Sequence, residues 1–172
     1  LNGVKTSARI VERQPRAAGT YVAVDLQPDI PPFLIGERLN SNGSKAFREA
    51  LLSGDMESIV KLAIKQENEG AMALDLCSAY AGRDEKADLV ELATQLRTAV
   101  KIPFMIDSTS PDCLEAVLKL LPGRALINSI NLEDGGKTLD KVCPLARRYG
   151  ATVVALTIGE KGMAMKAAEK VA

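Results

Sequence analysis

The sequence predicts an α/β fold with a parallel sheet, forming about the first five strands of a (β/α)8 TIM barrel. Short apolar segments alternate with amphipathic segments of helical period along the chain, a pattern typical of parallel strands joined by right-handed crossovers. Each apolar segment ends on polar residues. The chain has 172 residues, whereas a complete barrel needs about 250. An open, doubly wound sheet of five strands would be complete at this length and is the alternative.

Residues 1–32 are predicted to form a linker or docking arm, and residues 33–172 the N-terminal part of the barrel. The first segment contains four prolines, mixed charges and no sustained hydrophobic period, which is typical of a connecting segment. The chain opens on Leu1 rather than Met, so we expect it to be part of a longer polypeptide.

The predicted strands are apolar runs, a composition that indicates burial on both faces. The clearest is the run 101–110, in which an apolar segment ends abruptly on Asp107 and three hydroxyl residues. Ligands of parallel α/β proteins bind beyond the carboxyl ends of the strands, so Asp107 is a candidate site residue. The other predicted strands cover 33–40, 71–77, 125–131 and 151–157.

Helices are predicted between these strands from apolar spacing and from capping residues. Ser44 is a candidate N-cap, and Gly70 and Gly150 are candidate stops. Near Pro111, either Asp107 or one of the serines that follow it caps the next helix; capping by a serine leaves Asp107 free. The predicted helices cover 45–53, 55–69, 86–99, 111–121, 139–149 and the start of one at 163–172.

Composition excludes several classes of function. Basic and acidic residues balance at 22 each, so no charge excess indicates nucleic acid or a membrane surface. The absence of histidine removes a histidine base, histidine metal ligands and Ser-His or Cys-His nucleophiles. Cys77, Cys113 and Cys143 are scattered, which argues against a disulfide framework or a zinc site and favours the cytoplasm. No apolar stretch approaches the roughly 20 residues of a membrane span.

Polar side chains stand at the carboxyl end of every predicted strand. Because side chains alternate across a strand, one polar residue of each strand can share a face with an apolar residue two positions earlier. The pairs are Ile35 and Glu37, Ala73 and Asp75, Met105 and Asp107, Leu126 and Asn128, and Ala155 and Thr157. If that face is the barrel interior, carboxylates and carboxamides converge there, where they suit a flat heterocycle with an amidine-like or guanidine-like edge. No phosphate loop follows the first strand. The strand-end residues are Glu37, Asn40, Asp75, Asp107, Asn128, Ser129 and Thr157.

Four motifs resemble a known family. They are the segments 34–47, 73–77, 105–109 and 127–131, which read LIGERLNSNGSKAF, ALDLC, MIDST and INSIN. In this order and spacing they closely resemble the folate-binding domain of cobalamin-dependent methionine synthases, over about residues 33–172. The first 32 residues resemble the linker that precedes that domain.

The resemblance implies a TIM barrel of the pterin-binding type that binds 5-methyltetrahydrofolate and presents its N5-methyl group to cob(I)alamin. It implies that Asp107 and Asn128, as catalytic residues, hold the pterin edge together with Ser129. Glu37 and Asn40 would lie in the polar network of the first strand, and Asp75 would support the ring; Asn40 and Asp75 have a second interpretation as structural residues.

The same resemblance implies partners outside this chain: a cobalamin-binding domain or corrinoid protein, and a homocysteine domain that carries zinc. Two other interpretations stay open, a stand-alone methyltetrahydrofolate:corrinoid protein methyltransferase and a non-catalytic folate-binding fragment. Dihydropteroate synthase shares the fold but has a different loop pattern after the first strand.

Overall fold

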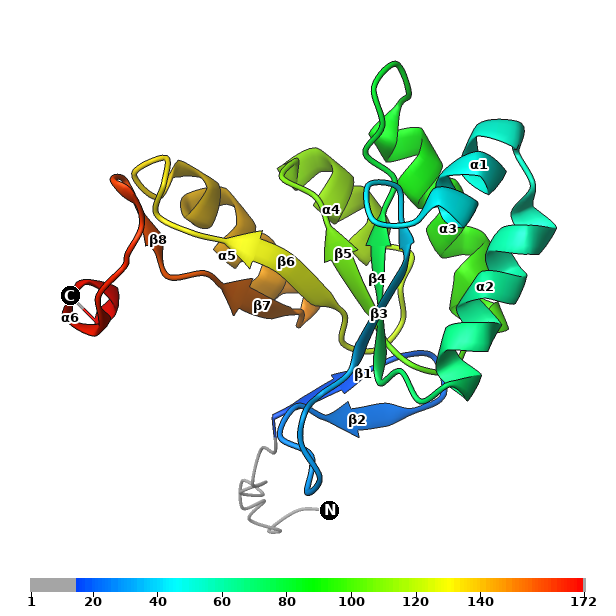
Figure 1. Ribbon diagram of the computed structural model, residues 1–172, viewed down its shortest axis with the longest axis horizontal. Helices are drawn as coiled ribbons and strands as arrows, with labels where there is room; N and C mark the ends of the chain where they lie inside the picture. Colours follow the sequence, from blue (N-terminus) through cyan, green and yellow to red (C-terminus); the bar gives the residue numbers. More distant parts are fainter. Residues whose placement is uncertain (1–14, 172) are drawn as a thin grey trace, which may run out of the picture.

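The computed structural model describes residues 15–171, and its centre is a five-stranded parallel sheet. The strands lie in chain order, β3-β4-β5-β6-β7, and Figure 1 shows them as a curved sheet with helices to its right and behind it. A doubly wound sheet would reverse its strand order, so the sequential order confirms the barrel prediction. The bounds are β3 Ile35–Asn40, β4 Ala73–Cys77, β5 Phe104–Asp107, β6 Leu126–Ile130 and β7 Thr152–Ala155.

Helices follow the strands at nearly the predicted positions. Capping side chains fix their starts: Ser44, Asp55 and Asp84 accept hydrogen bonds from the first turns of their helices. Ser110 caps the helix after β5 by accepting the Cys113 N–H, so that helix does not use Asp107 as its cap. The bounds are α1 Lys45–Ser53, α2 Met56–Asn68, α3 Glu85–Ala99, α4 Pro111–Leu118, α5 Lys137–Tyr149 and α6 Ala167–Val171. Within residues 15–171, no helix is long and apolar enough to cross a membrane.

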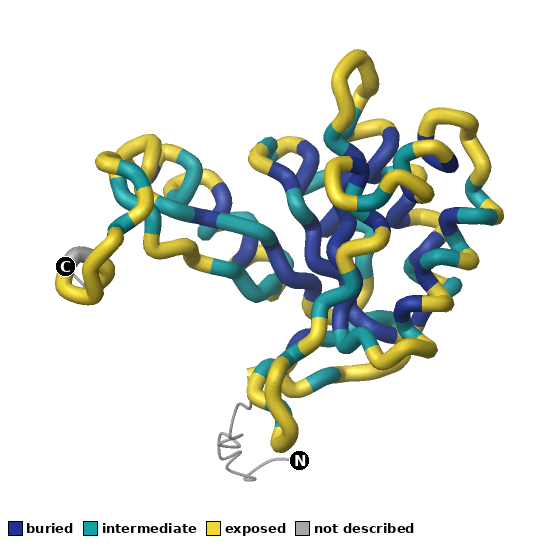
Figure 2. Tube along the Cα trace, viewed as in Figure 1, coloured by how far each residue is buried: buried dark blue, intermediate teal, exposed yellow. Residues whose placement is uncertain are grey.

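The two faces of the sheet carry different hydrophobic clusters. Leu74, Ile106 and Ile127 pack against the helices in the larger cluster, and Figure 2 shows that the strands in this region are buried. The smaller cluster contains Ala73 and Met105 and no helical residue, so it marks the barrel interior. Alternation along β4 and β5 therefore directs Asp75 and Asp107 to the interior as well.

A short hairpin precedes the barrel and closes the end of the sheet opposite the strand-end acids. Its strands are β1 Arg16–Ala18 and β2 Ala23–Asp25, each too short to give a periodic signal in the sequence. Ala17 is fully buried among interior residues of β4, β5 and β6. Gly19 also lies so close to the backbone of Ile102 that a Cβ there would be 2.5 Å from its oxygen. Residues 1–14 of the predicted arm lie outside the described residues.

The fifth unit differs from the prediction. β7 ends at Ala155, two residues early, and a hairpin of β8 Ile158–Gly159 and β9 Gly162–Met163 replaces the predicted loop. Gly162 has a φ of 89°, a conformation that favours glycine and interrupts helix formation here. The last helix therefore begins at Ala167 rather than near residue 163.

Candidate functional site

Asn40 enters the barrel interior because β3 is irregular. Gly36 pairs with Leu74 and Leu39 pairs with Leu76, so two residues of β3 stand opposite one residue of β4, as in a β-bulge. The extra residue resets the alternation: Leu39 joins the helix-facing cluster and Asn40 turns inward. Glu37 lies in this irregular segment and is exposed, so simple alternation does not place it.

The Asn40 side chain is held at both of its polar atoms. Its Oδ1 accepts the backbone N–H groups of Asn42 at 2.9 Å and Gly43 at 3.2 Å. Its Nδ2 donates to Asp75 Oδ2 at 2.8 Å and lies 3.4 Å from Asp107 Oδ2. The loop that follows β3 thus orients the amide so that its donor side faces two carboxylates on β4 and β5.

Asp75 is the most deeply placed acid of the set. On β4, Asp75 pairs in register with Met105 of β5, and the pair formed by Asp107 and Asn128 lies two residues further along β5. The exposed fraction of Asp75 is 2%. Its second oxygen, Oδ1, is buried and has no hydrogen-bond partner. Burial raises the pKa of Asp75 to about 6; the Asn40 hydrogen bond opposes this rise, and the nearby Asp107 and Glu37 carboxylates add to it.

Asp107 is half-buried at the end of β5. Burial raises the pKa of Asp107, the Asn40 hydrogen bond opposes that rise, and the Glu85 and Glu37 carboxylates add to it. Cys77, on β4, lies beside Asp107 of β5. Burial is the main cause that raises the pKa of its thiol to about 11. The Glu37 charge therefore acts on both Asp75 and Asp107, and the Glu85 charge acts on Asp107.

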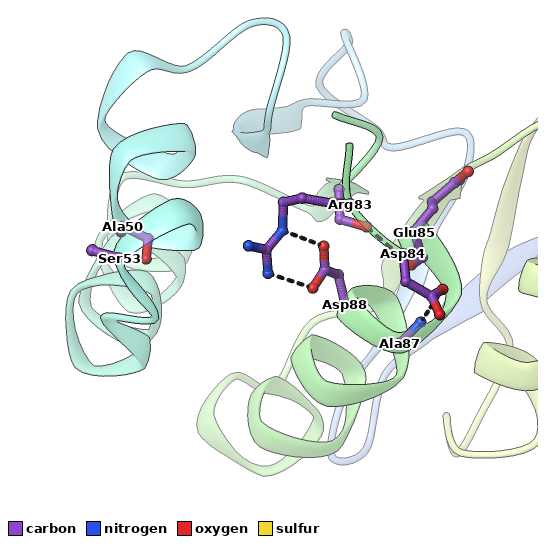
Figure 3. A network of polar contacts seen from close by, with 8 residues as sticks. Ala50, Ser53, Arg83, Asp84, Glu85, Ala87 and Asp88 are labelled. Atoms are coloured by element: carbon purple, nitrogen blue, oxygen red, sulfur yellow. Dashed lines mark hydrogen bonds and ion pairs between the residues drawn. The ribbon is translucent and has the colours of Figure 1, made fainter. Parts of the chain in front are cut away.

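Glu85 is a site residue that the sequence analysis missed. In sequence it is simply an acid in the first turn of a helix, which the helix dipole favours. Its Oε1 is buried and unpartnered, and Figure 3 shows its side chain extending away from the neighbouring Arg83–Asp88 pair. Arg83 pairs instead with Asp88 through bonds of 2.7 and 2.6 Å, and it is not a partner of Glu85 Oε1.

Asp107, Asn128 and Ser129 line a cavity of about 290 Å³ beyond β5 and β6. Asp134 also borders it, but this acid accepts the N–H and the hydroxyl of Thr138 at 2.8 and 2.7 Å. The hydroxyl bond, the largest effect, lowers the pKa of Asp134, so Asp134 serves the start of α5. The remaining lining residues are Thr109, Asn131, Glu133 and Thr138.

Thr157 was predicted to complete the set, and this prediction is wrong. On β7, Val154 is the residue that pairs with Asn128 and packs against the interior cluster, whereas Val153 packs against the helices. Ala155 therefore continues the helix-facing alternation, and the strand ends there. Thr157 lies beyond the strand and is exposed.

The arrangement is rich in acceptors. Asp75 and Asp107 offer carboxylate oxygens, and Asn128 adds an amide that both donates and accepts. Among the residues that the structure describes, no group of three or more histidine, cysteine or acidic side chains is placed to hold a metal ion. An unpartnered, buried carboxylate oxygen costs free energy unless a donor reaches it. The site therefore fits a ligand that brings several N–H donors on one edge.

Comparisons with known proteins agree with this geometry. Residues 36–172 match the family described as pterin binding enzyme. The chain is 43% identical over 171 residues to methionine synthase of Mycobacterium tuberculosis and 41% identical to that of Mycobacterium leprae. Each match covers 98% of this chain but only 14% of the relative.

Among solved structures, the fold is similar to dihydropteroate synthase of Xanthomonas albilineans. The complex with indole-2-carboxylic acid and 6-chloroguanine has a TM-score of 0.55 at 18% identity, over 83% of this chain and 49% of that one. The same enzyme with 4-aminobenzoic acid gives 0.54 at 18% identity, over 78% and 47%. At this identity the likeness establishes the fold alone.

Proposed function

Since the chain belongs to the family of pterin-binding enzymes, we propose that it binds 5-methyltetrahydrofolate and presents the N5-methyl group for transfer to cob(I)alamin. This would be one half-reaction of methionine synthesis from homocysteine. The observation that carries the proposal is that Asp107 and Asn128 pair in register and line one cavity, while Asp75 lies beside them and shares the Asn40 amide with Asp107. A reduced pterin has the required N–H groups along one edge.

In this proposal Asp107 and Asn128 bind the pterin edge directly, since both line the cavity and pair in register. Ser129 borders the same cavity. Asn40 and Asp75 lie behind Asp107, and Glu37 adds negative charge at the exposed side. A carboxylate that accepts two N–H groups from a flat ring fixes both its position and its orientation.

The residue types suit a reaction that needs no protein nucleophile. An N5 amine leaves more readily when it is protonated, and an acid-rich site can hold a proton near the bound ring. Cob(I)alamin, on another domain or partner protein, would supply the nucleophile. A zinc-bearing homocysteine domain would use the methyl group afterwards. We place this reaction in the cytoplasm because the three cysteines of the chain are free thiols, as is usual in a reducing compartment.

A stand-alone methyltetrahydrofolate:corrinoid protein methyltransferase would use the same site. The identity of 41–43% to two methionine synthases favours the first proposal. A folate-binding module without methyl transfer is the remaining alternative, and one experiment separates it from both enzymes.

That experiment measures two quantities in the complete natural protein: binding of 5-methyltetrahydrofolate by calorimetry, and demethylation of the folate in the presence of cob(I)alamin. We expect Asp107→Ala and Asn128→Ala to weaken binding by tenfold or more, a loss equivalent to about one hydrogen bond to a charged group each. Thr157→Ala is the matched control and should change neither quantity. Binding without any methyl transfer in the natural protein would support the module, and absence of folate binding would refute the proposal.

A further inference from the structure

We infer that Gln66, on a helix outside the barrel, is a positioning residue for the folate site because it holds the β3 bulge that turns Asn40 inward. The inference rests on the proposed function for its ligand, but the geometry stands by itself. Gln66 belongs to α2 and is 4% exposed. It is separated from the acids by the sheet, so its effect on them must pass through β3.

Both polar ends of the Gln66 side chain are engaged. Its Oε1 accepts the backbone N–H of Arg38 at 2.7 Å. Its Nε2 donates to the Leu62 carbonyl of its own helix at 3.3 Å. The side chain is therefore anchored to α2 at one end and holds β3 at the other.

The backbone N–H that donates to Gln66 is that of Arg38, in the irregular part of β3. Between Gly36 and Leu39 the register with β4 shifts, so Arg38 stands in the bulge, where the regular ladder does not satisfy its backbone. Arg38 is exposed as a residue, but its hydrogen bond to Gln66 is partly buried. A backbone N–H shielded from water without a partner is costly, and Gln66 supplies the acceptor. An apolar side chain of similar size would fill the same layer but would leave this N–H unpaired.

Gly36 makes the contact possible. A Cβ built at this position would lie 2.6 Å from Gln66 Oε1, closer than van der Waals contact allows. Any larger residue would therefore push the amide away from the Arg38 N–H. The glycine and the glutamine act as one unit at the entrance to the bulge.

The bulge decides which way Asn40 points. With regular alternation from Ile35, Asn40 would face the helices; with one extra residue it faces the interior. There it donates to Asp75 at 2.8 Å. The hydrogen bond from Arg38 to Gln66 is thus linked to the arrangement of the acids through the register of a single strand.

The test compares three variants of the complete natural protein. Gln66→Met removes the acceptor at nearly constant volume, Gln66→Glu keeps an acceptor oxygen, and Ile59→Val removes a methylene from a fully buried residue of the same helix. We expect Gln66→Met to weaken 5-methyltetrahydrofolate binding about tenfold and Gln66→Glu to recover most of that loss. Ile59→Val should lower the melting temperature without changing the affinity for the folate. If Gln66 had a purely structural role, all three variants would give this same result.

Two further measurements complete the test. In a double-mutant cycle, Gly36→Ala and Gln66→Met should each weaken binding, and the double variant should be no weaker than the worse single variant, because both break one hydrogen bond. Amide exchange at Arg38 should rise in Gln66→Met and not in Ile59→Val.

Unchanged affinity together with unchanged exchange in Gln66→Met would overturn the inference. If the natural protein does not bind the folate, the proposed function fails, and the exchange at Arg38 still decides whether Gln66 holds the bulge.

Discussion

Asn40 donates a hydrogen bond of 2.8 Å to Asp75 across β3 and β4, and the same nitrogen lies 3.4 Å from Asp107 on the next strand. One neutral amide therefore serves two carboxylates on adjacent strands. Burial and neighbouring carboxylates raise the pKa of both acids, and the Asn40 hydrogen bond is the main local interaction that favours their ionised forms. Changes to this donor, or to the charge around it, should alter both stability and ligand binding.

Asn40→Asp should destabilise the fold. The new side chain keeps an oxygen for the Asn42 and Gly43 N–H groups, but it removes the donor and adds a third carboxylate beside Asp75. We expect a loss of about 2–4 kcal/mol at pH 7.5, since charged acceptors are left without a partner, and a smaller loss near pH 5. Urea denaturation at the two pH values measures both. Asn42→Asp, the same change at an exposed residue, should cost less than about 0.5 kcal/mol; equal losses at both positions would contradict this explanation.

Asp75→Asn should stabilise the protein above pH 6. The pKa of Asp75 rises from 3.8 to about 6 on folding, so the folded state binds more protons than the unfolded state between these values. Stability therefore falls as the pH rises from about 4 to about 6, and the full cost remains at higher pH. From the size of the shift we expect a gain of up to about 3 kcal/mol at pH 7.5 and none below pH 4. Denaturation curves from pH 3.5 to 8 measure this gain in stability. If the stability of the variant depends on pH as strongly as that of the natural protein, another group causes that dependence.

Glu85→Gln should change the pH dependence of folate binding. The proposed complex needs ionised Asp107, whose pKa is raised by burial first and by Glu85 as a further cause. Affinity should therefore fall as the pH is lowered through that pKa. Removing the Glu85 charge lowers the pKa of Asp107, so the fall should move to lower pH. Calorimetric titrations over a pH series test this, with exposed Glu91→Gln on the same helix as the control that should leave the profile in place.

Ala17→Leu should destabilise the barrel. We propose that residues 15–32 act as a docking arm that closes the interior, since Ala17 is fully buried beside Ala73 and Met105. Three extra carbon atoms there overpack the cluster and should cost about 1–3 kcal/mol. Ala23→Leu, an exposed position in the same hairpin, is the matched control. Equal melting temperatures for the two variants would indicate an arm that does not contribute to the fold.

Much of the site could be predicted from sequence because its signals are local. Apolar runs that lead to Asp75, Asp107 and Asn128 locate three strands, and period-two alternation then directs each side chain correctly, although only Asp107 is the last residue of its strand. Ser110 before Pro111 is a local capping signal, and the structure uses it as one. These features need only neighbouring residues, and they also carry the family motifs.

Other features depend on contacts between distant residues. Nothing near Thr157 in sequence shows that β7 enters the sheet with Val154 facing inward; the register with β6 decides it. Glu85 becomes a site residue only because the fold brings its carboxylate close enough to act on Asp107.

The sequence by itself therefore determined the order of strands and helices, the family and the chemical character of the site. The tertiary structure decided which polar residues belong to it. The physical reason is that hydrophobic periodicity reports which face of an element is buried, whereas a bulge, a register and a charge environment depend on partners far along the chain. Asn40 is the clearest case, since its direction depends on Gln66, 26 residues later, accepting one backbone N–H of β3.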